Sequence, residues 1–524
     1  MSAYAFFRVF NLLKTPLENV HCWCSSVSDN IMDISTLSKS ILSVALTSNI
    51  TTSIATNFTY DLQPLLSSSA EIYYPGSEGY INATTRWDAY TKPGLDVVVK
   101  VACEEDVQET IRYANSHSVP FLAISGGHAT SSTLLEIKSG IGIYLRGLSG
   151  VSISPTDKSQ ALILGGTLSG EVISELWDLG KQTATGACDC VGFISPVLGG
   201  GHGWLEGRYG LMADNLISAR VVLANGTAVT VDNTQHSDLF WGLRGAGHNF
   251  GIVTSIYYQI YDRTPDIDSF ATATFTFTQD RLEEVFSIAN QWLAAKYRPV
   301  ELMYMGLIAF DPIVDSKPIV QFQLRWQGAD NIPDEYTDPL NALNPVSVIQ
   351  SHISLLNINA LTGASPSGPA CVDEIGRQLF PTDLDSWNVA SLRAVLDIFS
   401  TFPASFSNSL MLLEGYATNR VLEIPSDSTA YALRSKQLLA APFFTYPPND
   451  ETLQRDMIKL GKQIRNVMLN GTGEKLHAYV NYATGDESQE ALYGYEPWRL
   501  ERLRKLKKEY DPLGRFNFFG PIKM

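Results

Sequence analysis

The segment VVVKVACEEDVQETIRYANSHSVPFLAISGGH, residues 97–128, decides the fold. It begins with an apolar run at 97–101 and continues into 104–116, which has an acidic first turn and apolar residues at helical spacing. A second apolar run, 120–124, leads directly into Ser125-Gly-Gly-His128. The order strand, helix, strand predicts a β-α-β unit that carries a glycine loop at the end of its second strand.

A second glycine-rich tract, Gly186–Gly210, holds eight glycines and includes Gly199-Gly-Gly-His202-Gly203. Consecutive glycines let backbone N–H groups converge on an anion, and Ser125 and Thr130 add hydroxyl donors to the first loop. Each loop is therefore either a cradle for a diphosphate or a tight structural turn. Neither has the Gly-x4-Gly-Lys pattern of a Walker A loop or the GxGxxG pattern of a Rossmann fold.

The remaining chain divides into two regions that differ in the length of their expected strands and helices. Up to about residue 263 the expected strands are short, and Asn225-Gly226 within 219–231 is a strong hairpin signal. The stretch 73–88 is rich in turn residues. From about Thr264 the elements are longer, with expected strands at 269–278, 302–310, 319–327 and 438–446 and helices at 280–296, 451–469 and 496–510.

Length and composition limit the class of protein. A chain of 524 residues is too long for one compact core and predicts two packed domains. With 45% hydrophobic and 18% charged residues it is typical of a globular protein, and no apolar run is long enough to span a bilayer. The net charge of −16 argues against a nucleic-acid partner. No HExxH spacing or cysteine–histidine cluster indicates a metal site.

The compartment stays open between secreted and cytoplasmic. The apolar run at 3–13 is broken by Arg8 and Asn11, which makes a poor signal peptide. Five Asn-x-Ser/Thr sequons suit a secreted glycoprotein, at Asn49, Asn57, Asn82, Asn225 and Asn470.

The six cysteines are too few for a disulfide scaffold over this length. Cys103 and Cys371 stand alone in the sequence, whereas Cys188 and Cys190 form a close pair within the second glycine tract. The spacing Cys-Asp-Cys is one residue short of a CxxC redox pair.

With these motifs the chain resembles the FAD-binding domain of the vanillyl-alcohol oxidase and p-cresol methylhydroxylase superfamily. Within it the chain is most similar to the fungal members of the berberine bridge enzyme-like branch. The matching motifs are Arg86-Trp87, Pro93 to Val101, Ser125 to His128, Gly186 to Gly192, Gly199 to Gly203, Arg208 to Gly210, Asp214-Asn215, Asp238 to Gly245, Asn249 to Val253, Val480 to Tyr482, Tyr510 to Pro512 and Phe516-Asn517.

The resemblance implies a covalently bound FAD. In that family the His of Ser-Gly-Gly-His bonds to the 8α carbon of the flavin, a role that falls on His128. A Cys eleven residues before Gly-Gly-Gly bonds to flavin C6, and counting back from Gly199 gives Cys188. Cys190 is so close that either sulfur of the pair is a candidate for the second bond. The cofactor-binding residues implied are Ser125, Gly126, Gly127, His128, Ala129, Thr130, Cys188, Gly192, Gly199, Gly200, Gly201, Gly203, Asn249, Gly251, Val253 and Asn481.

The resemblance also implies an α+β, two-domain fold of the PCMH type, with an antiparallel-sheet substrate domain covering the flavin. The expected divisions are an N-terminal extension over 1–65, an FAD-binding domain over 66–263 with its core at 92–263, and a substrate domain over 264–446. The C-terminal segment, 447–524, is expected to return to the FAD-binding domain and to bring Asn481 and Tyr482 close to the flavin ring.

The implied activity is oxidation of a small molecule, with hydride transfer to the flavin and O2 as the electron acceptor. An alcohol or phenol of a fungal secondary metabolite is the expected substrate, and an oligosaccharide oxidase or a non-redox flavin cyclase are the alternatives. Some family members place a Glu base on a substrate-domain strand, but the matching strand here, 438–446, has no carboxylate. Tyr482 and Tyr446 are the candidates for the base, and both are equally readable as packing residues.

Overall fold

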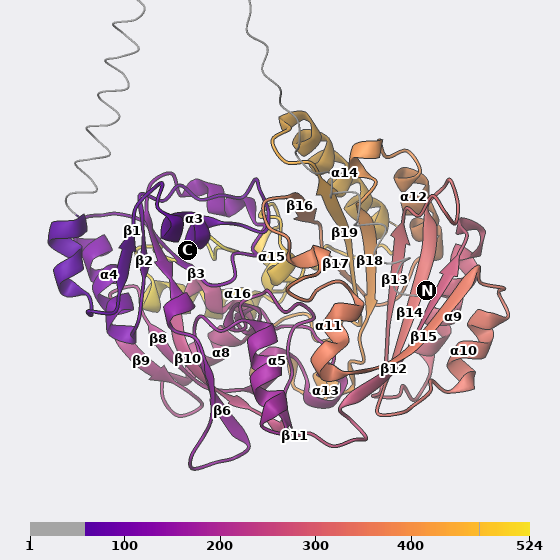
Figure 1. Ribbon diagram of the computed structural model, residues 1–524, viewed down its shortest axis with the longest axis horizontal. Coiled ribbons are helices and arrows are strands. Elements are labelled where there is room, and N and C mark those ends of the chain that lie inside the picture. Colours follow the sequence, from indigo (N-terminus) through magenta and orange to yellow (C-terminus); the bar gives the residue numbers. More distant parts are fainter. Residues whose placement is uncertain (1–57, 471) are drawn as a thin grey trace, which may run out of the picture.

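The structure is a computed structural model that describes residues 58–470 and 472–524. The sequons at Asn49 and Asn57, the apolar run at 3–13 and most of the expected extension over 1–65 lie outside these residues. Figure 1 shows the earlier elements, in purple and magenta, beside the later ones, in red and orange. Within the described residues, no helix has the length and apolar character needed to cross a membrane.

The predicted β-α-β unit is confirmed. Strand β2 (Val97–Lys100), helix α4 (Glu104–Ser116) and strand β3 (Phe121–Ile124) follow in order, and both strands run parallel to β4 (Ile141–Tyr144). Strand β1 (Glu71–Tyr73) pairs antiparallel with β2, which gives a four-stranded sheet in the order β1-β2-β4-β3. Because β3 is an edge strand, the Ser125–His128 loop that follows it lies at the edge of the sheet.

The stretch 73–88 was expected to consist of turns, and this expectation is wrong for its centre. Helix α3 (Glu78–Thr84) begins there, with the Ser77 side chain accepting a hydrogen bond from the Tyr80 backbone N–H at 3.2 Å. Ser is among the best helix N-cap residues, so the signal for a short helix was present in the sequence.

A second, antiparallel sheet completes the first half of the chain. Its hairpin is confirmed: β8 pairs with β9, and Gly226 has the positive φ of +79° that a glycine accepts readily. The strands lie in the order β5-β6-β10-β8-β9. Their bounds are β5 Val151–Ile153, β6 Gln160–Leu164, β8 Leu216–Val222, β9 Ala228–Val231 and β10 Ile252–Gln259, and helices α5 (Ser169–Asp178) and α8 (Ser237–Ala246) belong to the same half.

An eight-stranded antiparallel sheet forms the second half of the molecule. The main path runs β15-β12-β14-β13-β18-β19-β16, and β17 also pairs with β19. The strand bounds are β12 Ser269–Phe277, β13 Leu302–Ala309, β14 Ile319–Gln327, β15 Ser347–Ser354, β16 Gly376–Leu379, β17 Thr382–Leu384, β18 Leu410–Gly415 and β19 Leu438–Tyr446. All four long strands expected from the sequence are therefore present.

The two faces of this sheet have different roles. One face packs against three helices, α9 (Leu282–Ala294), α12 (Val389–Phe399) and α14 (Glu451–Asn470), in a continuous apolar core. Because successive side chains of a strand alternate between faces, every second residue points the other way, toward the first half of the chain. That second face supplies one wall of the cavity described below.

The C-terminal segment returns to the first half, as the resemblance implied. Helix α16 (Pro497–Tyr510) packs its leucines into the same core as α8. The Asn249 amide binds the segment that follows, accepting from the backbone N–H of Ile522 at 2.9 Å and donating to the carbonyl of Gly520 at 3.1 Å. In Figure 1 the yellow α15 (Gln489–Tyr493) and α16 lie among purple and magenta elements.

Short elements make the remaining connections. They are β7 (Lys181–Gln182), β11 (Tyr261–Asp262), α6 (Ile194–Leu198), α7 (Glu206–Tyr209), α10 (Asp334–Asn341), α11 (Ile358–Leu361) and α13 (Asn419–Glu423).

Candidate functional site

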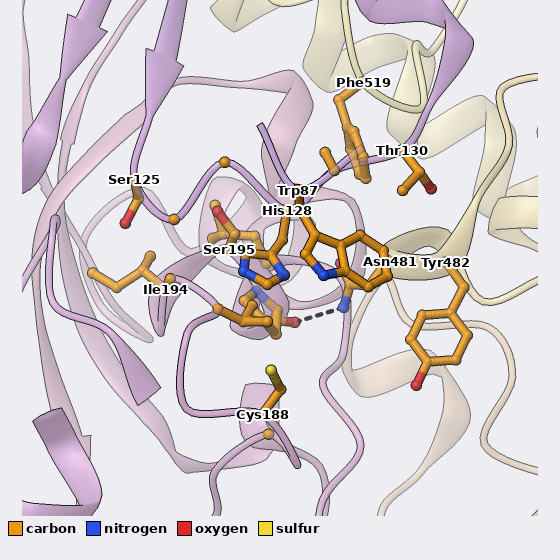
Figure 2. A pocket seen from close by; sticks show the side chains of 18 of the residues that line it. Trp87, Ser125, His128, Thr130, Cys188, Ile194, Ser195, Asn481, Tyr482 and Phe519 are labelled. Carbon is orange, nitrogen blue, oxygen red and sulfur yellow. Dashed lines mark hydrogen bonds between the residues drawn. The ribbon is translucent and has the colours of Figure 1, made fainter. Parts of the chain in front are cut away.

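A cavity of about 450 Å³ lies between the Ser125–His128 loop and the second face of the eight-stranded sheet. This volume is typical of a small-molecule site. Three parts of the chain line it: the loops of the first half, the sheet, and the C-terminal residues around Asn481 and Phe519. Figure 2 shows labelled side chains from two of these parts, the first half of the chain and the C-terminal residues.

The Ser125–His128 loop is held so closely that its glycines are required. A Cβ on Gly126 would lie 2.7 Å from the Cys190 carbonyl oxygen, and Gly127 has a φ of +70°. The Ser125 hydroxyl is buried and has no hydrogen-bond partner. The loop therefore brings its backbone close to the cavity with little side-chain bulk.

His128 lines the cavity, with its ring stacked on Trp87, the centroids 5.2 Å apart and the planes at 19°. Burial, with help from the Arg377 and Arg86 guanidiniums, lowers the pKa of His128 to about 3. The imidazole is therefore neutral at physiological pH and has a free lone pair. Figure 2 shows the stacked rings, with the Cys188 sulfur pointing toward them from the other side.

Cys188 and Cys190 have separate environments. Cys188 is a free thiol that lines the cavity, and burial raises its pKa to about 11. Cys190 forms a disulfide with Cys371, across 181 residues of chain. Cys371 is isolated in the sequence, but the fold brings its Cα atom to 5.9 Å from that of Cys190.

A carboxylate, Glu414, faces the cavity from β18. This strand pairs with β19, the strand matched to the one that carries a Glu in some family members. Glu414 is the only carboxylate among the described residues that line the cavity. One of its oxygens accepts a hydrogen bond from the Tyr416 hydroxyl at 2.7 Å, and the other, Oε2, is buried without a partner. Burial raises the pKa of Glu414 to about 7, against the opposing effects of the Tyr416 hydrogen bond and the nearby His202.

The two tyrosine candidates lie on opposite faces of the sheet. Tyr482 lines the cavity close to Glu414, and burial together with that carboxylate raises its pKa well above the ordinary value. Tyr446 belongs to the core behind the sheet, where its ring stacks on Tyr90 at 5.5 Å. The alternation of β19 explains this, because Phe443 points into the cavity and residues 444 and 446 point away from it.

The predicted cofactor-binding residues fall into two groups. Those that line the cavity are Ser125, Gly126, Gly127, His128, Ala129, Thr130, Cys188, Gly192, Gly251, Val253 and Asn481. Those that do not are Gly199, Gly200, Gly201, Gly203 and Asn249.

The second group acts through its neighbours. A Cβ on Gly199 would lie 2.2 Å from the Asn481 side-chain oxygen, so this glycine lets Asn481 approach. The Asn481 amide then donates to the Pro196 carbonyl at 3.0 Å, the bond drawn in Figure 2. A Cβ on Gly203 would lie 1.8 Å from the Thr185 carbonyl oxygen. Gly199 and Gly203 thus allow the second glycine loop to pack closely against its neighbours.

His202, from the second glycine loop, also lines the cavity. Its Nδ1 lies 3.0 Å from Glu206 and its Nε2 lies 2.9 Å from the Tyr431 hydroxyl. Burial opposes protonation, but the Glu206 carboxylate outweighs it and raises the pKa of His202. His202 stacks on Tyr416, and its protonated form opposes the rise in the pKa of Glu414.

Several site residues were missed by sequence reasoning. Glu414 could have been found as the one carboxylate in the apolar strand LMLLEG, at the same parity as the cavity-facing leucines. His248 could not, because nothing around it marks a site; its Nδ1 is buried without a partner, and burial lowers its pKa to about 4. Ile194, Ser195 and Phe519 line the cavity beside it.

Comparison with known proteins gives a consistent result. Family models for an FAD-binding domain and for "Berberine and berberine like" proteins match residues 95–232 and 478–523. The FAD-linked oxidoreductase chyH of Penicillium rubens is 39% identical over 470 residues, covering 88% of this chain and 93% of the relative. The FAD-linked oxidoreductase chry5 of Gibberella zeae is 39% identical over 476 residues, covering 87% and 93%.

Solved structures share the fold. The glucooligosaccharide oxidase of Acremonium strictum, which carries a 6-S-cysteinyl, 8α-N1-histidyl FAD, matches with a TM-score of 0.75 at 20% identity, over 88% of this chain and 98% of that one. The berberine bridge enzyme-like protein 1 of Physcomitrella patens matches with a TM-score of 0.74 at 21% identity, over 87% and 98%.

Proposed function

Because this chain belongs to the berberine bridge enzyme-like family of FAD-linked oxidoreductases, we propose that it oxidises an alcohol, a phenol or a related group on a largely apolar small molecule. FAD is the cofactor and O2 is the proposed acceptor. The observation that carries the proposal is Glu414, a single carboxylate in a largely apolar wall, facing the same cavity as His128 and Cys188.

The residues of the cavity fit FAD. Two buried polar atoms, Ser125 Oγ and His248 Nδ1, have no partner within the protein and suit a polar ligand. The glycines at 126 and 127 bring backbone N–H groups up to the space where a diphosphate would bind. The neutral imidazole of His128 would hold the flavin covalently, and Cys188 would provide a second bond.

The chemistry that FAD supplies when bound is the acceptance of a hydride equivalent from substrate carbon. The chain's own task is to hold the substrate and take its proton. Glu414 would remove the proton from the substrate hydroxyl onto its partnerless Oε2, while the Tyr416 hydrogen bond keeps the carboxylate in place. Its pKa of about 7 is close to optimal for a general base at neutral pH.

Tyr482 would donate a hydrogen bond in this arrangement. Its pKa is raised far above neutrality, so the phenol keeps its proton and can bind the substrate oxygen or Glu414. We therefore replace the expectation of a tyrosine base with a Glu414 base that is assisted by Tyr482.

The sheet wall supports an apolar substrate. Across the strands, Gln323, Met305 and Glu414 lie in one register row, and this row forms the polar end of the wall. The following positions of the same face are apolar: Leu307, Leu410, Leu412 and Phe443. A sugar needs hydrogen-bond partners along its whole length, whereas a flat or branched hydrocarbon body packs well on such a surface.

An oligosaccharide oxidase is the second candidate, favoured by the fold it shares with the glucooligosaccharide oxidase. A cyclase that uses flavin only as a scaffold is the third. The division into an FAD-binding domain up to residue 263 and a substrate domain over 264–446 remains part of this proposal.

Anaerobic mixing with a panel of aromatic polyketide alcohols and oligosaccharides tests the proposal. We expect an apolar alcohol to bleach the visible flavin absorbance, and admission of air to restore it with formation of hydrogen peroxide. Bleaching by sugars alone would favour the second candidate. Product formation without any bleaching would favour the cyclase and contradict the proposal.

A further inference from the structure

Three sulfur atoms meet beside the cavity. The Sγ atoms of Cys188, Cys190 and Cys371 all lie within 4.8 Å of one another. Two of them are joined as the Cys190–Cys371 disulfide and the third is a free thiol. Any two of the three are therefore close enough to pair after small side-chain movements, and the fold selects one pairing out of three.

The disulfide joins the two halves of the molecule. Cys190 belongs to the second glycine tract, and Cys371 lies between β15 and β16, in the connection that also contains Asn359 and Ala364. The intervening residue Asp189 is bound to the same connection: its carboxylate accepts from the Asn359 amide at 2.7 Å and its backbone N–H donates to the Ala364 carbonyl at 2.9 Å. The connection is therefore bonded to Asp189 and Cys190, the two residues that directly follow Cys188.

The three sulfurs face two different spaces. Cys188 lines the main cavity, together with His128. Cys190 and Cys371 line a second, polar cavity of about 230 Å³, which the Ser125–His128 loop also lines and Cys188 does not. The disulfide and the free thiol therefore lie beside different cavities.

We propose that the Cys190–Cys371 disulfide is a guard for Cys188: by pairing the two neighbouring sulfurs with each other, it leaves one thiol facing the cavity and reserves it for the flavin. The inference rests on the proposed covalent attachment of flavin at Cys188. It adds that the disulfide, and not Cys188 alone, decides which sulfur is available.

Without the Cys190–Cys371 disulfide, Cys188 can be oxidised together with a neighbouring thiol. If Cys190 is removed, Cys371 becomes a thiol within reach of Cys188. With O2 as oxidant, the two S–H bonds break and one S–S bond forms between Cys188 and Cys371. The two protons and two electrons are transferred to O2, which becomes hydrogen peroxide. Cys188 is then consumed and unavailable to the flavin.

Two variants separate the guard from a simple cross-link. Cys190→Ser loses the disulfide and leaves Cys371 as a spare thiol. The double variant Cys190→Ser/Cys371→Ser also loses the disulfide but leaves no spare thiol, so it is the matched control. Each protein is purified in air with its flavin, denatured in acid, treated with iodoacetamide without reductant and mapped by peptide mass spectrometry.

We expect wild-type protein to show Cys190 linked to Cys371 and Cys188 bound to flavin. In the double variant Cys188 should be bound to flavin, as in wild type. In Cys190→Ser the fraction of Cys188 bound to flavin should fall by more than half, with a matching gain of a Cys188–Cys371 disulfide. Identical states of Cys188 in the single and double variants would overturn the guard.

The state of Cys188 in wild-type protein is a further test. A Cys188 that is found in a disulfide with either neighbour contradicts the proposal. If wild-type Cys188 carries only the iodoacetamide label and flavin is found on histidine alone, the second attachment is wrong. The guard is then judged separately, by whether the Cys188–Cys371 disulfide forms in Cys190→Ser and is absent from wild type.

Discussion

The two walls of the cavity, the loops of the first half and the eight-stranded sheet, show how burial produces different chemistry in different side chains. On the loop wall, burial lowers the pKa of the His128 imidazole to about 3 and raises that of the Cys188 thiol to about 11. On the sheet wall, the same effect raises the pKa of the Glu414 carboxyl to about 7. Burial favours the neutral form of each group, because a charge loses its hydration in a low-dielectric site.

The consequence for function differs between the walls. His128 and Cys188 each keep one protonation state around neutral pH. Glu414 has a pKa near neutral pH, so its charge changes there, which suits a group that moves a proton. We therefore propose attachment at the loop wall and proton transfer at the sheet wall.

The largest expected effect is the complete loss of bound flavin after denaturation. In a His128→Ala/Cys188→Ser variant neither proposed bond can form, so acid precipitation should release all flavin into the supernatant. Each single variant should keep its flavin in the pellet through the remaining bond. The measurement is flavin absorbance in pellet and supernatant. Flavin that washes out of denatured wild-type protein would contradict covalent attachment altogether.

Removal of the base should have the next largest effect. Glu414→Gln keeps the size of the side chain and its hydrogen bond to Tyr416 but cannot take a proton. Flavin reduction by substrate should slow by roughly 10²–10⁴-fold, as is typical of a lost general base. Stopped-flow absorbance under anaerobic conditions measures it. A rate within a few-fold of wild type would return the role of base to Tyr482.

Tyr482→Phe should have a smaller effect. The ring and its packing are kept, and a hydrogen bond to a charged or reacting group is lost. Such a bond contributes about 1.5–3 kcal/mol, which corresponds to roughly 10- to 150-fold in rate. The comparison with Glu414→Gln in the same stopped-flow experiment is the control, and a larger loss in Tyr482→Phe would reverse the assignment.

Tyr446→Phe should have the smallest effect. Its hydroxyl lies on the core side of the sheet and not in the cavity. Flavin reduction should stay within about twofold of wild type, since surface or core changes away from a site act mainly on stability. Thermal unfolding measures the stability in parallel. A large loss of rate at unchanged stability would show that this residue reaches the substrate.

Much of the fold could be predicted from the sequence, because its signals are local. The β-α-β unit follows from periodicity, and the Asn225-Gly226 hairpin follows from turn chemistry. The place of His128 at the site followed from the family resemblance of the Ser125–His128 motif, and His128 does line the cavity.

Other parts of the site depend on contacts between distant segments. The Cys190–Cys371 pairing joins residues 181 apart, and nothing near Cys371 in the sequence marks it. The carboxylate was sought on β19 and lies on the neighbouring strand β18. Side chains of both strands face the cavity, so the sequence of one strand does not show which of them carries it. The face of the sheet on which Tyr446 lies depends on its place in the alternation of side chains along β19. The identity of the residue does not reveal this place.

The pH dependence of flavin reduction tests the central claim most directly. A carboxyl with a pKa of about 7 in the folded protein is a base only above that pH, so the anaerobic reduction rate should be constant at alkaline pH and fall about tenfold for each unit below roughly 7. In Glu414→Gln this slope should disappear while the spectrum of the bound flavin stays unchanged. A wild-type slope that persists in Glu414→Gln would contradict the assignment of Glu414 as the proton acceptor.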